Sequence, residues 1–130
     1  MSLRVTVRAG RVEFDLELDD SPVTTQIDRL VPFEGTCKLW GEDMNFPLPT
    51  RVDVGGARGS MSVNTGDVAY CPADATLRIY FGRTPFSGME QPMPHKSVIV
   101  FGRVVGDYQV LQRIEEGARL KISRASSVPG

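Results

Sequence analysis

Strict alternation of apolar and polar residues over the first eighteen positions is the feature that most restricts how this chain can fold. Apolar residues occupy every second position on both sides of a turn at Ala9-Gly10. They are Leu3, Val5, Val7, Val12, Phe14, Leu16 and Leu18. A period of two places alternate side chains on opposite faces of a strand. The pattern therefore predicts an antiparallel hairpin with one face in the core and the other in water.

Short strand-like runs separated by turn residues continue along the rest of the chain. A second hairpin is predicted around the turn at Gly41-Glu42. A nearly continuous apolar run late in the chain is typical of a central strand buried on both faces. The predicted strands after the first hairpin are Gly35–Trp40 and Asp43–Leu48, a weaker pair Arg51–Val54 and Ser60–Val63, then Asp67–Cys71, Leu77–Phe81, the apolar run Val98–Val105 and finally Arg119–Ser123.

Two segments change from the strand period to the helical one. Ser21 is a good N-cap and Pro22 suits the first helical position, where its missing N–H needs no partner. An apolar stripe follows at helical spacing, and Pro32 ends the helix. Asp107 caps a second, shorter helix that we expect Gly117 to terminate in the left-handed conformation.

Strands that do not alternate with helices make a parallel sheet improbable. An antiparallel barrel leaves no exposed sheet edge, and two amphipathic helices can cover its open ends. We therefore predict a mainly β protein, a closed antiparallel β-barrel capped by two α-helices, in one domain over residues 1–125. Residues 126–130 are predicted to be a disordered C-terminal tail.

Composition excludes several classes of function. The 15 Lys and Arg residues against 16 Asp and Glu give a net charge of −1, so no nucleic acid partner is expected. The longest apolar stretch, Val98–Phe101, is too short to span a membrane. No secretory signal precedes the first strand, which predicts a cytoplasmic protein with Cys37 and Cys71 as buried, reduced thiols.

Motifs that carry known chemistry are weak. Gly55–Ser60 is rich in glycine, as phosphate loops are, but alternation after it favours a hairpin loop. A lone histidine, His95, and two distant cysteines give no paired spacing for a metal, so neither metal nor cofactor is predicted. No nucleophile elbow surrounds any serine.

The segment from Gly82 to Lys96 is long and has no periodicity, which is uncommon in a compact domain outside lids and binding loops. It contains Phe86, Met89 and Met93, which a polar linker would avoid. Three interpretations stay open at this point: a loop that contacts a ligand, a plug that places Phe86 in the core, or the contact surface of a homodimer.

Four segments are similar to a small group of prokaryotic cyclophilin-like proteins, atypical relatives of the cyclophilins. The resemblance covers nearly the whole chain, from the first hairpin to Ser123. The segments are Pro32-Phe33-Glu34-Gly35, then Leu39-Trp40-Gly41-Glu42-Asp43-Met44-Asn45-Phe46, then Gly66-Asp67-Val68-Ala69-Tyr70-Cys71-Pro72, and finally Tyr80-Phe81-Gly82-Arg83-Thr84-Pro85. The resemblance implies the cyclophilin-like barrel.

Cyclophilins catalyse the cis–trans isomerisation of X–Pro bonds, and the resemblance brings that activity into consideration. The enzymes carry a Phe-His-Arg segment and a Gln-Gly-Gly-Asp segment. Neither occurs in this chain, where Thr65-Gly66-Asp67 is at most a reduced form of the second. The resemblance therefore assigns no catalytic residue here.

We predict instead a binding protein that holds a small molecule or a short, proline-containing peptide in a cleft on the barrel. The candidate cleft residues come from the family-like segments and from the segment Gly82–Lys96, called the long loop below. They are Trp40, Glu42, Phe46, Tyr70, Phe81, Arg83, Thr84 and Phe86. Aromatic walls with a few polar groups are typical of such pockets. Two alternatives stay open: these aromatics are core neighbours across strands, or the protein is a divergent isomerase that uses Arg83 or Arg78.

Overall fold

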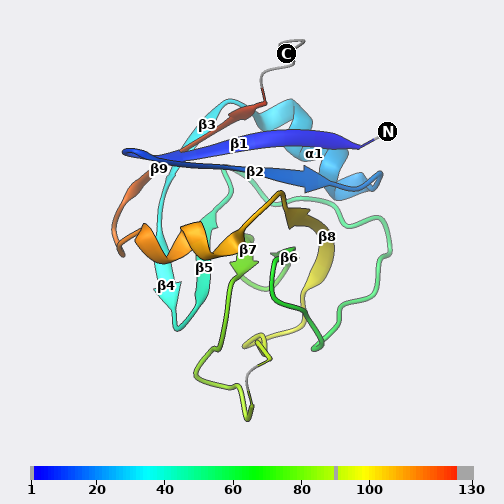
Figure 1. The fold of residues 1–130 in the computed structure, drawn as a ribbon. Coiled ribbons are helices and arrows are strands. Elements are labelled where there is room, and N and C mark those ends of the chain that lie inside the picture. Colours follow the sequence, from blue (N-terminus) through cyan, green and yellow to red (C-terminus); the bar gives the residue numbers. More distant parts are fainter. Residues whose placement is uncertain (1, 90, 126–130) are drawn as a thin grey trace.

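A single sheet, curved into a barrel, forms the framework of the computed structural model, which describes residues 2–89 and 91–125 (Figure 1). Within these residues the sheet has nine strands in the order β3-β9-β1-β2-β8-β6-β7-β5-β4, and every pairing is antiparallel. The strands are β1 (Leu3–Ala9), β2 (Val12–Leu18), β3 (Phe33–Thr36), β4 (Lys38–Trp40), β5 (Asp43–Pro47), β6 (Asp67–Cys71), β7 (Thr76–Tyr80), β8 (Ile99–Val104) and β9 (Arg119–Arg124).

The first hairpin has the register that its alternation predicts. Val5 lies opposite Leu16, and Val7 lies opposite Phe14. All four side chains are buried in the main core, while Arg4 and Glu17 form an ion pair on the outer face. A shift of one residue would expose every apolar side chain of the pair, so the core itself fixes this register.

The barrel comes close to closure because its two outermost strands are neighbours in the chain. β3 pairs with β9, β4 pairs with β5, and only Cys37 separates β3 from β4. Cys37 extends the contact with the β9 side, since its N–H donates to the Ala118 carbonyl at 2.8 Å and its carbonyl accepts from Gly117. Cys37 is fully buried, and burial, followed by the nearby charge of Glu116, raises the pKa of its thiol to about 11.

The first helix forms as predicted. α1 (Pro22–Leu30) begins after Ser21, whose hydroxyl accepts the N–H of Thr24, and it turns Val23 and Ile27 into the core. The second helix differs from the prediction: η1 (Tyr108–Arg113) is a 3₁₀ helix rather than an α-helix. The two helices lie well apart on the barrel (Figure 1).

The form of η1 has a physical reason. Its apolar residues Tyr108, Leu111 and Ile114 recur every third position, and three residues per turn is the period of the 3₁₀ helix. Asp107 caps it as predicted by accepting the N–H of Gln109 at 2.9 Å. The helix ends at the cap residue Ile114, so Gly117, with φ of 88°, belongs to the turn that enters β9.

Two strand predictions are wrong. The weaker pair, Arg51–Val54 with Ser60–Val63, does not form strands, and its one bridge joins Ser60 to Val98. Side chains replace the ladder there: the N–H of Val52 donates to the Tyr70 hydroxyl, and the N–H of Asp53 donates to Gln26.

The late apolar run is also not buried on both faces. β8 alternates, with Val100 38% exposed and Arg103 in solvent.

The face of β5, β6 and β7 that is turned away from the main core, called the second face below, is also covered. The outer face of the first hairpin is not. Four consecutive residues of β7, Leu77 to Tyr80, are buried. Leu77 and Ile79 face the main core. Tyr80 packs instead in a second cluster with Val63, Ala69, Cys71 and Val98. Val63, from the segment before β6, and Val98, directly before β8, thus make this part of the sheet two-sided, and the pocket described below lies on the same second face.

None of the helices in the described part of the chain is long and apolar enough to cross a membrane. The predicted tail, residues 126–130, lies outside the described residues.

Gly102 is expected to be intolerant of any side chain. A Cβ there would lie 2.5 Å from the Glu17 carbonyl oxygen and 2.8 Å from the Leu18 side chain, in the β2–β8 pair. Gly102→Ala should lower the free energy of unfolding by roughly 1–3 kcal/mol, as overpacking does, in urea denaturation. Gly88→Ala is the control, because a Cβ at Gly88 meets nothing within 4 Å. Equal midpoints for the two variants would contradict this packing.

Candidate functional site

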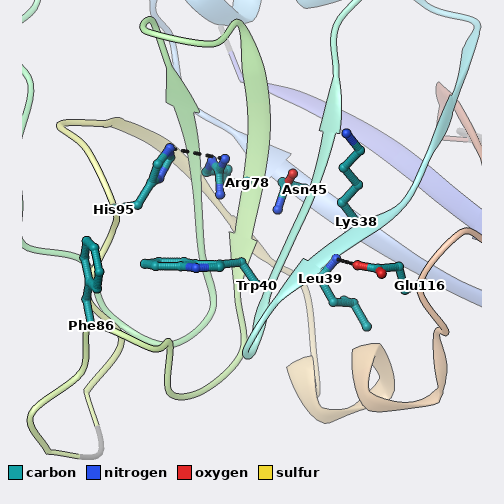
Figure 2. Close-up of a pocket in the computed structure, with 8 residues that line it drawn as sticks. All are labelled: Lys38, Leu39, Trp40, Asn45, Arg78, Phe86, His95 and Glu116. Carbon is teal, nitrogen blue, oxygen red and sulfur yellow. Dashed lines mark hydrogen bonds between the residues drawn. The ribbon is translucent and has the colours of Figure 1, made fainter.

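A pocket of about 400 Å³ opens on the second face of the sheet, where β4, β5 and β7 run side by side. This size falls within the roughly 300–1,000 Å³ typical of small-molecule sites. Figure 2 shows its lining residues, which come from these three strands, the long loop and the segment before β9. They are Lys38, Leu39, Trp40, Asn45, Arg78, Phe86, His95 and Glu116.

A polar row crosses the floor of the pocket. Lys38 lies opposite Asn45, and Asn45 lies opposite Arg78, so the three residues share one line across β4, β5 and β7. Directly paired residues on adjacent strands point to the same face. The sheet register alone therefore aligns an ammonium, an amide and a guanidinium along one side of the cavity (Figure 2).

Arg78 forms a buried ion pair behind this row. Its Nη1 donates to Asp43 Oδ2 at 2.7 Å, with 8% of the arginine side chain exposed and none of the aspartate. Asn45 Nδ2 donates to the other carboxylate oxygen, Oδ1, at 3.3 Å. Burial opposes the charged form of Arg78, yet the charge and hydrogen bond of Asp43 prevail and raise the pKa of the guanidinium. Removing one partner of such a pair typically costs about 3–5 kcal/mol.

The guanidinium is held from its other side by the β6–β7 turn and the loop. Arg78 Nη2 donates to Asp74 Oδ2 at 3.2 Å, and the same oxygen lies 3.1 Å from His95 Nε2. Arg78 Nε donates to the Thr76 hydroxyl, which itself donates to Asp74 Oδ1 at 2.6 Å. Burial works against ionised Asp74, but its hydrogen bonds from Thr76 and Cys71 and the charge of Arg78 lower its pKa to about 2.

An aromatic wall faces the polar row. The Trp40 and Phe86 rings meet edge to face with centroids 4.9 Å apart, and the His95 ring lies 5.6 Å from Trp40. Phe86 remains 56% exposed, so the interpretation that places it in the core as a plug is wrong. The loop carries a large apolar side chain to the mouth of the pocket and leaves it there in contact with solvent.

Two of the eight predicted cleft residues, Trp40 and Phe86, line the pocket. Phe46, Tyr70 and Phe81 lie in the main core instead, each at most 6% exposed. Phe46 follows Asn45 on β5, so it points to the inner side of the barrel while Asn45 points outward. Tyr70 on β6 is paired with Leu77, as Phe46 is, and points inward with them. For these three aromatics, the alternative of core neighbours describes the structure.

Glu42, Arg83 and Thr84 hold the start of the long loop against the β4–β5 turn. The backbone N–H of Glu42 donates to the Arg83 carbonyl at 2.7 Å, and its carboxylate accepts the Arg83 N–H at 3.3 Å. The Thr84 hydroxyl donates to the Met93 carbonyl at 2.5 Å. None of the three lines the pocket, and they act by positioning the loop that does.

The polar residues of the pocket were missed by sequence reasoning as members of a cleft. Lys38 and Asn45 could have been predicted from strand alternation. Lys38 is two positions from Trp40 and Asn45 is two positions from Asp43, so each pair shares one face of its strand. Arg78 was considered only as a catalytic alternative. Glu116 comes from a segment far along the chain, where its Oε1 accepts the Leu39 N–H at 3.0 Å, and no local pattern indicates that contact.

Cys71, Asp74 and His95 approach one another closely enough to be tested as a metal site. Their potential ligand atoms lie within 4.8 Å of one another. The Arg78 guanidinium is a competing cation there, 3.2 Å from Asp74 and 3.5 Å from His95. Burial raises the pKa of the Cys71 thiol, which disfavours the thiolate that a metal requires. These contacts fit a hydrogen-bonded network better than a metal centre.

Comparison with known proteins places the chain in a family. The profile of the Cyclophilin-like family matches residues 1–123, and the protein belongs to that family. Its structure is similar to the solution structure of the hypothetical protein AF2241 from Archaeoglobus fulgidus, with a TM-score of 0.82 and 26% identity over 95% of both chains.

A second solved structure shares the fold at much lower identity. McbB, determined in complex with tryptophan, gives a TM-score of 0.69 at 10% identity, over 97% of this chain and 46% of McbB. No protein of curated function matches the sequence significantly.

The Asp74 network predicts a specific dependence of stability on pH. The folded-state pKa of Asp74, about 2, lies below its ordinary value of 3.8. Ionised Asp74 therefore stabilises the fold above about pH 4, and this contribution is lost as the pH falls toward 2. Asp74→Asn should lower the thermal midpoint at pH 5–7, and its difference from wild type should shrink between pH 4 and pH 2.

Thr76→Val provides the matched test of the cause. Loss of the hydroxyl should raise the pKa of Asp74 toward 3.8 and move the acid limb of the stability curve upward. A wild-type minus Asp74→Asn difference that stays constant from pH 7 to pH 3 would show that Asp74 does not carry this linkage.

Proposed function

We propose that this protein binds a small molecule or a short peptide in the pocket between the aromatic wall and the polar row. The observation that carries the proposal is Phe86, an aromatic residue held edge to face against Trp40 at the pocket mouth while more than half exposed. A large apolar side chain in that place contributes less to the core than a buried one does. The exposed apolar surface of Phe86 would be removed from water if the ring covered a bound ligand.

The chemistry of the walls supports the same proposal. One side supplies apolar and aromatic surface, and the other supplies a few fixed polar groups, the combination that orients small ligands. The polar side is preorganised, because the Asp43 and Asp74 contacts hold Arg78 in place. McbB, which shares the fold over part of its length, was solved with tryptophan, and a ligand of similar size and character agrees with the dimensions of this pocket.

Trp40 makes the proposal directly testable, since it is the single tryptophan of the chain. Titration with libraries of metabolites and proline-containing peptides should change its fluorescence and raise the melting temperature, more so for tighter ligands at a given concentration. Phe86→Ala should weaken binding by about tenfold or more, as loss of a central aromatic contact does. Met89→Ala on the same loop is the control, being 82% exposed and outside the lining. No change in Trp40 emission with any compound would refute the proposal.

A divergent peptidyl-prolyl isomerase is the second candidate, favoured by the position of Arg78. The barrier to X–Pro rotation is about 18–20 kcal/mol, and a donor directed at the prolyl nitrogen lowers it by stabilising the transition state. Arg78 lines a partly apolar pocket, whereas the Arg83 side chain is exposed and outside it.

A protease-coupled assay with a proline peptide distinguishes this candidate. If the protein is an isomerase, Arg78→Lys should lower the rate at least tenfold, while Arg83→Ala should leave it unchanged. The lysine variant keeps a cation beside Asp43 and limits the loss of stability. Rates equal to those of the buffer blank would exclude the activity.

A further inference from the structure

We infer that the ligand is a planar, typically aromatic, carboxylate, with its ring against the Trp40 indole and its anionic group at the Lys38–Asn45 side of the pocket. This inference rests on the proposed function and names the chemical class that the site selects. It follows from which polar groups of the pocket already have partners and which remain available.

The charge of Arg78 is already balanced. Asp43 and Asp74 accept hydrogen bonds from its two terminal nitrogens, and Thr76 accepts from Nε. Two carboxylates within 3.2 Å leave no net positive charge at this end of the row. Arg78 can therefore contribute an N–H group to a ligand but offers little long-range attraction for an anion.

Lys38 is the cation without a counterion at the site. Within the described part of the chain, no ion pair or hydrogen bond engages its ammonium group. The nearest candidate acid of the lining, Glu116, uses Oε1 to accept the Leu39 N–H and forms no ion pair with Lys38. Lys38 is thus free to pair with a ligand carboxylate, and it disfavours a cation at the same place.

Asn45 gives the carboxylate a directed hydrogen bond. One N–H of its Nδ2 donates to Asp43 Oδ1, which fixes the orientation of the amide and leaves the second N–H unused. Asn45 is 5% exposed and lies beside Lys38 in the strand register. An anionic oxygen at this point receives a charged donor from the rim and a neutral donor from the floor.

The aromatic wall at Trp40 determines which shape of ligand fits beyond the carboxylate group. Figure 2 shows the Trp40 indole lying along one side of the cavity while Lys38, Asn45 and Arg78 lie along the other. Phe86 and His95 meet Trp40 near one end, so one face of the indole is open toward the row. A planar ring stacks on such a surface with offset geometry, which a bulky aliphatic group does not match.

The experiment compares three probes of nearly equal size and different charge: 3-phenylpropionate, its neutral amide 3-phenylpropionamide, and the cationic 3-phenylpropylamine. Binding is measured on the full chain by Trp40 fluorescence and by isothermal titration calorimetry. The acid should bind at least tenfold more tightly than the amide, and the amine should bind most weakly. The advantage of the acid should fall as salt is raised from 20 to 300 mM, because a rim lysine is screened by ions.

Lys38→Gln tests the assigned residue. It should reduce the affinity of the acid to that of the amide and leave the amide unchanged. Lys121→Gln is the matched control, because it removes the same charge from an exposed position on β9 outside this pocket. Both variants replace exposed side chains, so both are expected to fold.

The outcomes separate this inference from the function on which it rests. If the amide or the amine binds as well as the acid, or if Lys38→Gln has no selective effect, the ligand class is wrong while a binding pocket still stands. If none of the three probes changes the Trp40 signal or releases heat at millimolar concentration, the ligand class is overturned. The pocket as a binding site is overturned only if the metabolite and peptide libraries also leave the Trp40 emission unchanged.

Discussion

The Arg78–Asp43 ion pair is the constraint around which the functional face of this barrel is arranged. Both charges lie at the surface of a sheet, yet both are buried, with Asp43 fully inaccessible. A buried charge is tolerated only when it is paired and its remaining hydrogen-bonding groups find partners. Strand register supplies half of this requirement, because Asp43 and Arg78 come from adjacent, paired strands. Thr76 and Asp74 supply the other half by accepting the Nε and Nη2 hydrogens of Arg78, and the long loop before β8 adds His95 at 3.1 Å from Asp74.

Covering that face also creates the pocket. The loop is linked internally by the Thr84 hydroxyl, which donates to the Met93 carbonyl, and it is attached to the segment before β6 by Gln91, whose amide donates to the Val63 carbonyl at 2.7 Å. Once fixed at these points, it carries Phe86 to the edge of Trp40 and His95 to the Arg78–Asp74 pair. The same segment that protects the buried charges therefore brings in the aromatic wall, and cover and pocket form from one set of contacts.

The pocket lies at the seam of the barrel, which is the second constraint on its shape. β4 is the last strand of the sheet, so one of its edges lacks a partner strand. Glu116 satisfies the exposed Leu39 N–H in place of a strand and thereby protects the edge from pairing with another chain. Glu116 and the Cys37 contacts stand where a further strand would pair, and the pocket on the outer face extends past the edge of β4 to Glu116.

Strand alternation predicted the first hairpin and the helical period predicted α1, because each of these elements has one exposed face and one buried face. The strands β5, β6 and β7 are buried on both faces, so alternation carries less information there. It could not assign the faces of β7, where Leu77 and Arg78 are both buried. In such a strand the pattern marks two faces without indicating which one is the core. Phe46 and Tyr70 are predicted at the cleft because they stand in the family-like segments, but both belong to the interior. Contacts such as Leu39–Glu116 join segments that are far apart in the chain and meet only when the barrel forms. No local pattern in the sequence therefore predicts them.

The way Arg78 is held favours binding over isomerisation as the role of the pocket. Stabilising a transition state electrostatically requires donors that are preorganised and not already neutralised. Arg78 meets the first condition and fails the second, since two carboxylates and a hydroxyl accept its hydrogen bonds. Its contacts hold the floor rigid and keep the neighbouring Asn45 amide in place through Asp43. The arginine acts chiefly as the scaffold of the pocket, and among the described residues Lys38 is the lining cation that forms no ion pair.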